Sequence, residues 1–243
     1  MRAAATVAGV CQLTYFPLWA KGPAPALALA HSGLRWCGAF PADWAALKPT
    51  TEWSKLPLLV VPASDEAAAP LRISHELAIL SWIGRTVPAL GGVSDREWAA
   101  SQQVMCECED IYSKLTKFQP TTRQPDKCTP EQLASLWSST DAAVHNRDQG
   151  LRVNLGHLDA FAASEGRAWG PGRLSATGTT VGESKLFATL HTLVLIEPSV
   201  LSAHPHLGAF YERFVDLAPT RAVLEDGGEM PGAFEQYFVR GDM

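Results

Sequence analysis

Tyr15 is the first residue of this chain whose type and position could do chemistry. It closes the stretch CQLTYF, whose β-branched and aromatic residues favour a short strand, and a loop with Pro17, Lys21 and Gly22 follows. A phenol hydroxyl in such a place can donate a hydrogen bond that stabilises an anion, without itself acting as a base. A tyrosine half buried against a sheet is the commoner arrangement, so the rest of the sequence has to decide between the two.

The five cysteines are the second chemically active set, and they indicate free thiols. Their number is odd, and a chain of 243 residues is too long to depend on a disulfide framework. Cys106 and Cys108 lie in a stretch that reads as helix, where side chains two residues apart point in different directions. Further metal ligands do not follow within reach of this pair. We therefore expect no metal site and a reducing compartment.

Composition and charge indicate a packed protein and argue against a general nucleic-acid binder. Hydrophobic residues make up 47% of the chain and charged residues 19%. The net charge is −5, and no cluster of Lys and Arg offers the basic surface that nucleic acid requires. No segment reaches about 18 uninterrupted apolar residues, so we expect no membrane span. We expect a soluble, cytoplasmic protein, or an organellar one if an N-terminal transit peptide has been removed.

Short strands alternate with helices over residues 10–86, which we expect to form the first domain. APALALAHSG predicts a helix that ends at Gly33, and PLRISHELAILSWIGRT predicts a second helix with Ser74 as its N-cap. LRWCGAF and LPLLVVPA predict strands, and PADWAALKP predicts a helical turn that ends before Pro49. This order describes an α/β unit whose helices pack on a sheet.

VPALGGVSD breaks this pattern with Pro and Gly and predicts a linker. Every later segment is helical in period, so we expect a second, all-helical domain over residues 94–243. HPHLGAFYERFVDL predicts one of its helices. Capping residues mark the starts of three others, at Ser94 with Glu97, at Thr129 with Pro130, and at Thr180 with Glu183.

Five of these motifs, in this order, resemble those of the cytosolic glutathione transferases. The resemblance runs from about Gln12 to Glu225 and is greatest to the tyrosine-type classes pi, mu and sigma. It implies a glutathione transferase fold, with an α/β thioredoxin-like N-terminal domain followed by an all-α helical C-terminal domain. The matching stretches are LTYFPL, DWAALKP, Leu56-Pro57, HELAI, and the run from GESKLFATLHTL to HPHLGAFYERF.

The resemblance also implies a site for glutathione, the co-substrate of that family. Tyr15 is expected to donate its hydroxyl to the glutathione sulfur and so to favour the thiolate. A cis bond before Pro57 is expected to turn the backbone of Leu56 toward the cysteinyl part of the peptide. Other contacts with glutathione are expected from Lys21, Trp44, Lys48, Lys55, His75 and Glu76.

Several positions depart from the family pattern around this ligand. His75 and Glu76 stand where the family has Gln-Ser for the γ-glutamyl end, and an ionised Glu76 would repel the carboxylate there or pair with the α-ammonium. Lys55, directly before Leu56-Pro57, stands where the family has a glutamine. Trp19 and Ala26 replace arginines, and Cys106 replaces an aspartate that reaches the partner subunit's glutathione. Together these changes suggest altered or lost glutathione affinity.

Two functions of different class are therefore open. The first is a glutathione transferase of detoxification type, which joins the thiol to an apolar electrophile beside Trp19. Met105, Tyr112 and Leu115 are candidates for lining that electrophile pocket. The second is a non-catalytic subunit or scaffold of a larger assembly. The resemblance implies a homodimer. A thioredoxin-type redox enzyme is less favoured, because Cys11 precedes the first strand and no Cys-x-x-Cys exists.

Overall fold

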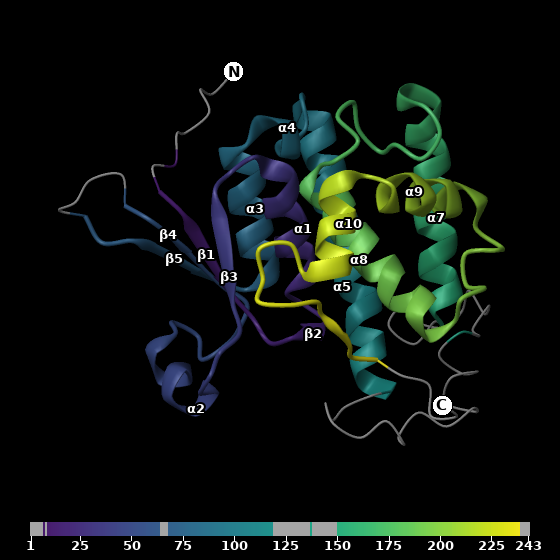
Figure 1. Cartoon of the computed structure of the whole chain (residues 1–243). Helices are drawn as coiled ribbons and strands as arrows, with labels where there is room; N and C mark the ends of the chain where they lie inside the picture. Colours follow the sequence, from purple (N-terminus) through teal and green to yellow (C-terminus); the bar gives the residue numbers. More distant parts are fainter. Residues whose placement is uncertain (1–6, 8, 64–67, 119–136, 138–149, 239–243) are drawn as a thin grey trace.

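The computed structural model of the chain places a small sheet with its helices beside a larger helical part (Figure 1). The thioredoxin-like N-terminal part and the helical C-terminal region expected from the sequence are both present. The exact division at residues 10–86 and 94–243 stays a prediction. The helix expected to start at Thr129 lies outside the described residues. The structure describes residues 7, 9–63, 68–118, 137 and 150–238.

Four strands form the main sheet, in the order β3-β1-β4-β5. β1 (Cys11–Thr14) runs parallel to β3 (Trp36–Ala39) and antiparallel to β4 (Leu58–Val61). β5 (Leu71–Ser74) pairs antiparallel with β4 at the edge. Parallel neighbours need a crossover connection, and α1 (Pro23–Ser32) supplies it between β1 and β3.

The first two helices of the N-terminal part follow the sequence pattern, and a 3-10 turn follows the second of them. α1 ends at Gly33, whose φ of 71° is the left-handed conformation that glycine adopts at helix ends. α2 (Trp44–Leu47) lies where the helical turn is expected. This helix ends before Pro49, as predicted, and a separate 3-10 turn (Lys48–Thr50) that contains Pro49 follows it. Proline is tolerated there because the first residues of a helical turn need no N–H partner.

α3 (Glu76–Thr86) begins one residue later than the sequence predicts. Ser74, predicted as its N-cap, is instead the last residue of β5 and pairs with Leu58 in the sheet. His75 follows with a φ of 72°, a left-handed conformation that turns the chain sharply from strand to helix. Glu76 thus becomes the first helical residue, and it is only 3% exposed.

The predicted linker contains a short helix, α4 (Pro88–Gly91), before the long helix α5 (Asp95–Phe118). The predicted cap at Ser94 is present, since its Oγ accepts a hydrogen bond from the N–H of Glu97 at 3.2 Å. The Glu97 carboxylate accepts from the N–H of Ala176 at 3.3 Å. The start of α5 is therefore fastened to the loop that precedes the central helix.

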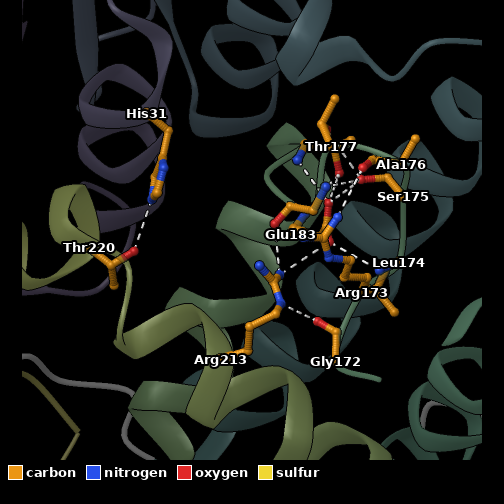
Figure 2. A network of polar contacts seen from close by, with 12 residues as sticks. His31, Gly172, Arg173, Leu174, Ser175, Ala176, Thr177, Glu183, Arg213 and Thr220 are labelled. Atoms are coloured by element: carbon orange, nitrogen blue, oxygen red, sulfur yellow. Dashed lines mark hydrogen bonds and ion pairs between the residues drawn. The ribbon is translucent and has the colours of Figure 1, made fainter. Parts of the chain in front are cut away.

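That central helix, α8 (Val181–Ile196), is buried along most of its length. Thr180 and Glu183 form the predicted capping box, in which Glu183 Oε2 accepts the N–H of Thr180 at 2.9 Å. Figure 2 shows that Glu183 is also the meeting point of a wider polar network. The Ser175 hydroxyl donates to Oε2 at 2.7 Å, and the Arg213 guanidinium lies 3.6 Å from Oε1. These partners satisfy a carboxylate that would otherwise be costly to bury.

The remaining helices surround α8, and the chain then returns to the first part. α7 (Leu151–Trp169) packs against α5 and against α9 (Pro205–Val215), while α10 (Ala218–Asp226) packs against α1. After α10 the chain runs back beside the start of the fold (Figure 1). There β6 (Glu235–Gln236) pairs in parallel with β2 (Leu18–Trp19).

Among the described residues, no helix combines the length and the apolar character needed to cross a membrane.

Candidate functional site

Tyr15 follows β1 directly and is held in a closed position, with its side chain 7% exposed. The loop after it turns so tightly that a Cβ on Gly22 would lie 2.1 Å from the Tyr15 ring, so glycine is required there. The Tyr15 hydroxyl accepts a hydrogen bond from the N–H of Lys21 at 3.0 Å. Burial raises the pKa of Tyr15, against the opposing effect of that N–H. The phenol therefore stays protonated at neutral pH and keeps its hydrogen available as a donor.

Two lysines and two glutamates form a charge cluster beside Tyr15. Lys185 of α8 places Nζ 2.8 Å from Glu76 Oε2 and 3.4 Å from Glu109 Oε2. Lys21 pairs with Glu109 Oε1 and lies 3.9 Å from Glu76 Oε2. The four formal charges cancel. The cluster is therefore neutral as a whole, unlike the cationic subsite that an anionic ligand would favour.

Burial and neighbouring charges act against each other within this cluster. Burial alone would lower the pKa of Lys185, but the carboxylates of Glu76 and Glu109 outweigh it and raise the pKa. Burial raises the pKa of Glu76, and Lys185 and Lys21 oppose that rise. Burial also acts to raise the pKa of Glu109, which is more open, but the two lysines prevail and lower it. Lys185 is thus held as an ammonium, which requires a carboxylate beside it.

Aromatic side chains close the cluster on the side of α5. Lys21 Nζ lies 4.3 Å from the centroid of the Tyr112 ring, and Lys185 Nζ lies 5.6 Å from it, both within cation–π range. Phe238 from the C-terminal segment packs edge-on against Tyr112, with centroids 5.6 Å apart, and Tyr237 packs on Phe238. The space next to Tyr15 on this side is therefore filled by the protein itself.

The expected pocket for an apolar electrophile is not open in this structure. Trp19 is 3% exposed and its Nε1 donates to the carbonyl of Ala188 at 3.1 Å, so it belongs to the core and does not line a substrate pocket. Met105 is likewise buried, at 2% exposure. Tyr112 and Leu115 do line a shared cavity, but its volume is about 10 Å³. Such a space holds no more than about one water molecule.

An open cavity of about 290 Å³ lies on the other side of the charge cluster, between the start of β4 and the start of α3. The Leu56–Pro57 bond at its wall is cis, as the resemblance implies. These two residues precede β4, and α3 presents His75 and Glu76 at the same opening. The cavity is lined by Lys21, Lys55, Leu56, Pro57, His75, Glu76, Leu77 and Glu109.

Most residues predicted to contact glutathione therefore meet at one cavity, but three do not line it. Lys48 is exposed on the 3-10 turn and does not line the cavity. Trp44 is half buried and packs edge-on against Phe16, with ring centroids 5.5 Å apart. Tyr15 lies behind the cavity wall, next to Lys21, whose side chain lines the cavity and whose N–H holds the Tyr15 hydroxyl.

Lys185 and Glu109 are the functional candidates that the sequence analysis missed. For Lys185 a signal existed, because it is the only charged residue in the otherwise uncharged run SKLFATLHTLVLI. A lysine in such a run must either reach solvent or find a buried partner. Glu109 lies in the acidic stretch ECED, which reads as an ordinary exposed helix face.

The paired cysteines of α5 point apart, as predicted. Cys106 is exposed, whereas Cys108 is fully buried, and burial raises the pKa of its thiol to about 12. Within the ranges that the structure describes, no three or more His, Cys, Asp or Glu side chains are grouped so that they could hold a metal ion.

Comparisons with known proteins show what this fold is similar to. Neither a protein-family model nor a curated protein matches the chain. Among solved structures, the sigma class glutathione transferase of Fasciola hepatica is 21% identical, with a TM-score of 0.71 over 88% of this chain and 94% of that one. The glutathione S-transferase from Ascaris lumbricoides is also 21% identical, with a TM-score of 0.65 over 88% and 96%.

A third solved structure, prostaglandin synthase D of Nilaparvata lugens, is 16% identical, with a TM-score of 0.64 over 88% of this chain and 96% of that one. At such identities the likeness concerns the fold alone. The chain has the glutathione transferase fold, in agreement with the resemblance seen in its sequence.

Proposed function

We propose that this protein binds glutathione, or a closely related thiol peptide, in the 290 Å³ cavity beside the cis Leu56–Pro57 bond. The observation that carries the proposal is the meeting of the predicted contacts at one opening. The backbone of Leu56, the start of α3 at His75 and the Lys55 side chain all border it. An extended peptide can pair with backbone next to a strand end, and its terminal carboxylate can meet the Lys55 ammonium.

Tyr15 is proposed to favour the thiolate of the bound peptide. A free thiol has a pKa of about 8.5, so only a few per cent is ionised at neutral pH. A thiol that lies against Lys21 is next to the Tyr15 hydroxyl, which is a neutral donor for the reasons given above. Its O–H would bond to the sulfur anion, and the thiol proton would pass to solvent. Each unit by which the thiol pKa falls corresponds to about 1.4 kcal/mol.

Conjugation to a large apolar electrophile is the less favoured part of this proposal. The side chains of Tyr112, Tyr237 and Phe238 occupy the space beside the charge cluster, and the cavity left there is about 10 Å³. This observation favours a second candidate function, a non-catalytic subunit or scaffold with the transferase fold. The free cysteines Cys11 and Cys37 fit a reducing compartment in either case.

A homodimer is proposed on the strength of the resemblance, and sedimentation at several concentrations tests it. Trp53, which is 66% exposed between α2 and β4, is a candidate contact residue.

Calorimetric titration with glutathione at neutral pH, up to about 10 mM, tests the proposed function. We expect saturable heat, with half-saturation in the micromolar to low millimolar range. The absence of heat at the highest concentration would contradict peptide binding and support the scaffold function. Glu212→Gln, at an exposed position of α9 that does not line the cavity, is a control that should bind as the wild type does.

A further inference from the structure

We infer that the cavity selects a thiol peptide whose head group is an amine without an adjacent carboxylate, and that Glu76 with its partner Lys185 sets this preference. The inference rests on the proposed binding of a peptide at the same cavity. It concerns the end of the ligand that lies against α3.

One carboxylate oxygen of Glu76 accepts no hydrogen bond from the described residues. Glu76 is one of the residues that line the cavity, and it is only 3% exposed. Oε2 is bound to Lys185, whereas Oε1 has no hydrogen-bond partner among the described residues. A buried carboxylate oxygen without a donor is unfavourable, so a ligand that brings an N–H to it gains affinity. An ammonium gains more than a neutral donor because the bond is charge-assisted.

The same end of the cavity disfavours a carboxylate. The N-terminus of α3 would attract an anion, but the first residue of that helix is Glu76 itself, whose carboxylate already stands there. Both nearby cations are also engaged. Lys185 contacts Glu76 and Glu109, and Lys21 contacts Glu109. A second carboxylate beside Glu76 would thus face two existing ones, and the two lysines that contact them are already engaged.

The other titratable groups that face the cavity do not change this balance. Lys55 is exposed, adjoins Leu56 and borders the same cavity, where a terminal carboxylate of the peptide can meet it. His75 is exposed and lies near the Trp53 ring, with centroids 6.3 Å apart. The cavity therefore presents both an exposed cation, on Lys55, and a buried anionic oxygen of Glu76 that has no hydrogen-bond donor among the described residues.

Three peptides that differ only in the head group separate the contributions of its ammonium and its carboxylate to the affinity. Glutathione carries both an ammonium and a carboxylate on its γ-glutamyl residue. The peptide γ-aminobutyryl-cysteinyl-glycine keeps the ammonium and lacks that carboxylate, whereas glutaryl-cysteinyl-glycine keeps the carboxylate and lacks the ammonium. The thiol, the backbone and the glycine end are the same in all three. Any difference in affinity therefore reports the Glu76 end.

Calorimetric titration of the wild-type protein with these three peptides is the first test. We expect the aminobutyryl peptide to bind at least tenfold more tightly than glutathione, and the glutaryl peptide to bind most weakly. Glutathione binding as tightly as the aminobutyryl peptide, or more tightly, would overturn the inference and leave the proposed function standing. Failure of all three to bind would overturn the proposed function itself.

A double variant then tests whether the Glu76–Lys185 pair is the cause. Glu76→Gln with Lys185→Gln removes both charges and leaves no single charge buried alone. We expect the preference for the aminobutyryl peptide to fall to threefold or less, and an unchanged preference in a folded double variant would contradict the assignment. Arg96→Gln with Glu165→Gln is the matched control, because that ion pair joins α5 to α7 and lines no part of the cavity. If the double variant does not fold, the ranking of the three peptides on the wild type still decides.

Discussion

Lys185 Nζ lies 2.8 Å from Glu76 Oε2, and both side chains are only 2% exposed. The two residues are 109 positions apart in the sequence. One begins α3 beside the sheet, and the other lies on the central helix of the helical part. This buried ion pair therefore joins the two parts of the fold at the wall of the proposed peptide cavity.

Loss of one member of this pair should cost far more than loss of both. Lys185→Met leaves the Glu76 carboxylate buried with only the more distant Lys21, and we expect it to lower the free energy of unfolding by about 3–5 kcal/mol. Combining Lys185→Met with Glu76→Gln should recover much of that loss. Denaturant unfolding followed by circular dichroism measures both.

The control for this prediction is Arg96→Gln, which breaks an ion pair whose arginine side chain is 70% exposed. We expect it to cost less than about 1 kcal/mol. A Lys185→Met variant as stable as this control would contradict the assignment of a coupled buried pair.

Tyr15→Phe should raise the pKa of a bound thiol by at least one unit, or about 1.4 kcal/mol, because it removes the proposed donor to the thiolate. Binding of the peptide in its thiol form should change little, because the Tyr15 hydroxyl stabilises mainly the thiolate. The ultraviolet absorbance of the thiolate, followed against pH with saturating peptide, gives that pKa. Tyr211→Phe is the matched control, because the hydroxyl of Tyr211, on α9, bonds to His191 of α8. An equal thiol pKa in the Tyr15 variant and the wild type would remove Tyr15 from the site.

Two half-buried histidines should make the fold less stable in acid. Burial lowers the pKa of His31 to about 4, helped by Arg213, and burial lowers that of His191 to about 4 as well. Both are below the value of about 6.5 for an unfolded chain. The unfolded state thus binds more protons between these values. Stability is full above pH 6.5 and falls toward pH 4, by at most about 1.4 kcal/mol per pH unit for each histidine.

Unfolding free energies measured from pH 7 to pH 4 check this prediction. In the His31→Gln variant, the free energy of unfolding should depend less steeply on pH, by the contribution of one histidine. The variant should also be less stable at pH 7, because it loses the hydrogen bond to Thr220 (Figure 2). His157→Gln, at an exposed position of α7, controls for the loss of a titratable side chain. Parallel slopes for His31→Gln and the wild type would show that His31 is not responsible.

Phe238→Ala should open the space that an electrophile would need. Phe238 is 3% exposed and packs on Tyr112, so its loss creates a cavity and lowers stability by about 3–5 kcal/mol. The new space adjoins the charge cluster and is lined by aromatic rings. We expect binding of a small apolar dye, or conjugation of an apolar electrophile, to rise severalfold in this variant. Phe161→Ala, on α7, is the control for a truncated phenylalanine elsewhere in the helical part. An increase no greater than in the control would mean that the C-terminal segment does not limit access.

Local features of this fold could be predicted from the sequence because their partners lie within a few residues. The Thr180–Glu183 capping box and the end of α1 at Gly33 depend on hydrogen bonds and backbone preferences that neighbouring residues supply. The cis Leu56–Pro57 bond is also local, although only the family resemblance implied it. The position of Ser74 shows the limit of predicting structure from neighbouring residues alone. Its type favours a helix N-cap, but pairing with Leu58 in the sheet places it in a strand.

The sequence by itself determined three strands of the main sheet and most of the long helices, the resemblance to the glutathione transferases, and the placement of Tyr15 at a strand end. Only the tertiary structure decided which charges meet and which space stays open. Lys185 and Glu76 are brought together by the packing of α8 against α3. The Phe238 side chain fills the expected electrophile pocket because β6 returns to pair with β2. Periodicity and capping act over one or two helical turns, whereas burial, ion pairing and cavity volume depend on elements that are distant in the chain.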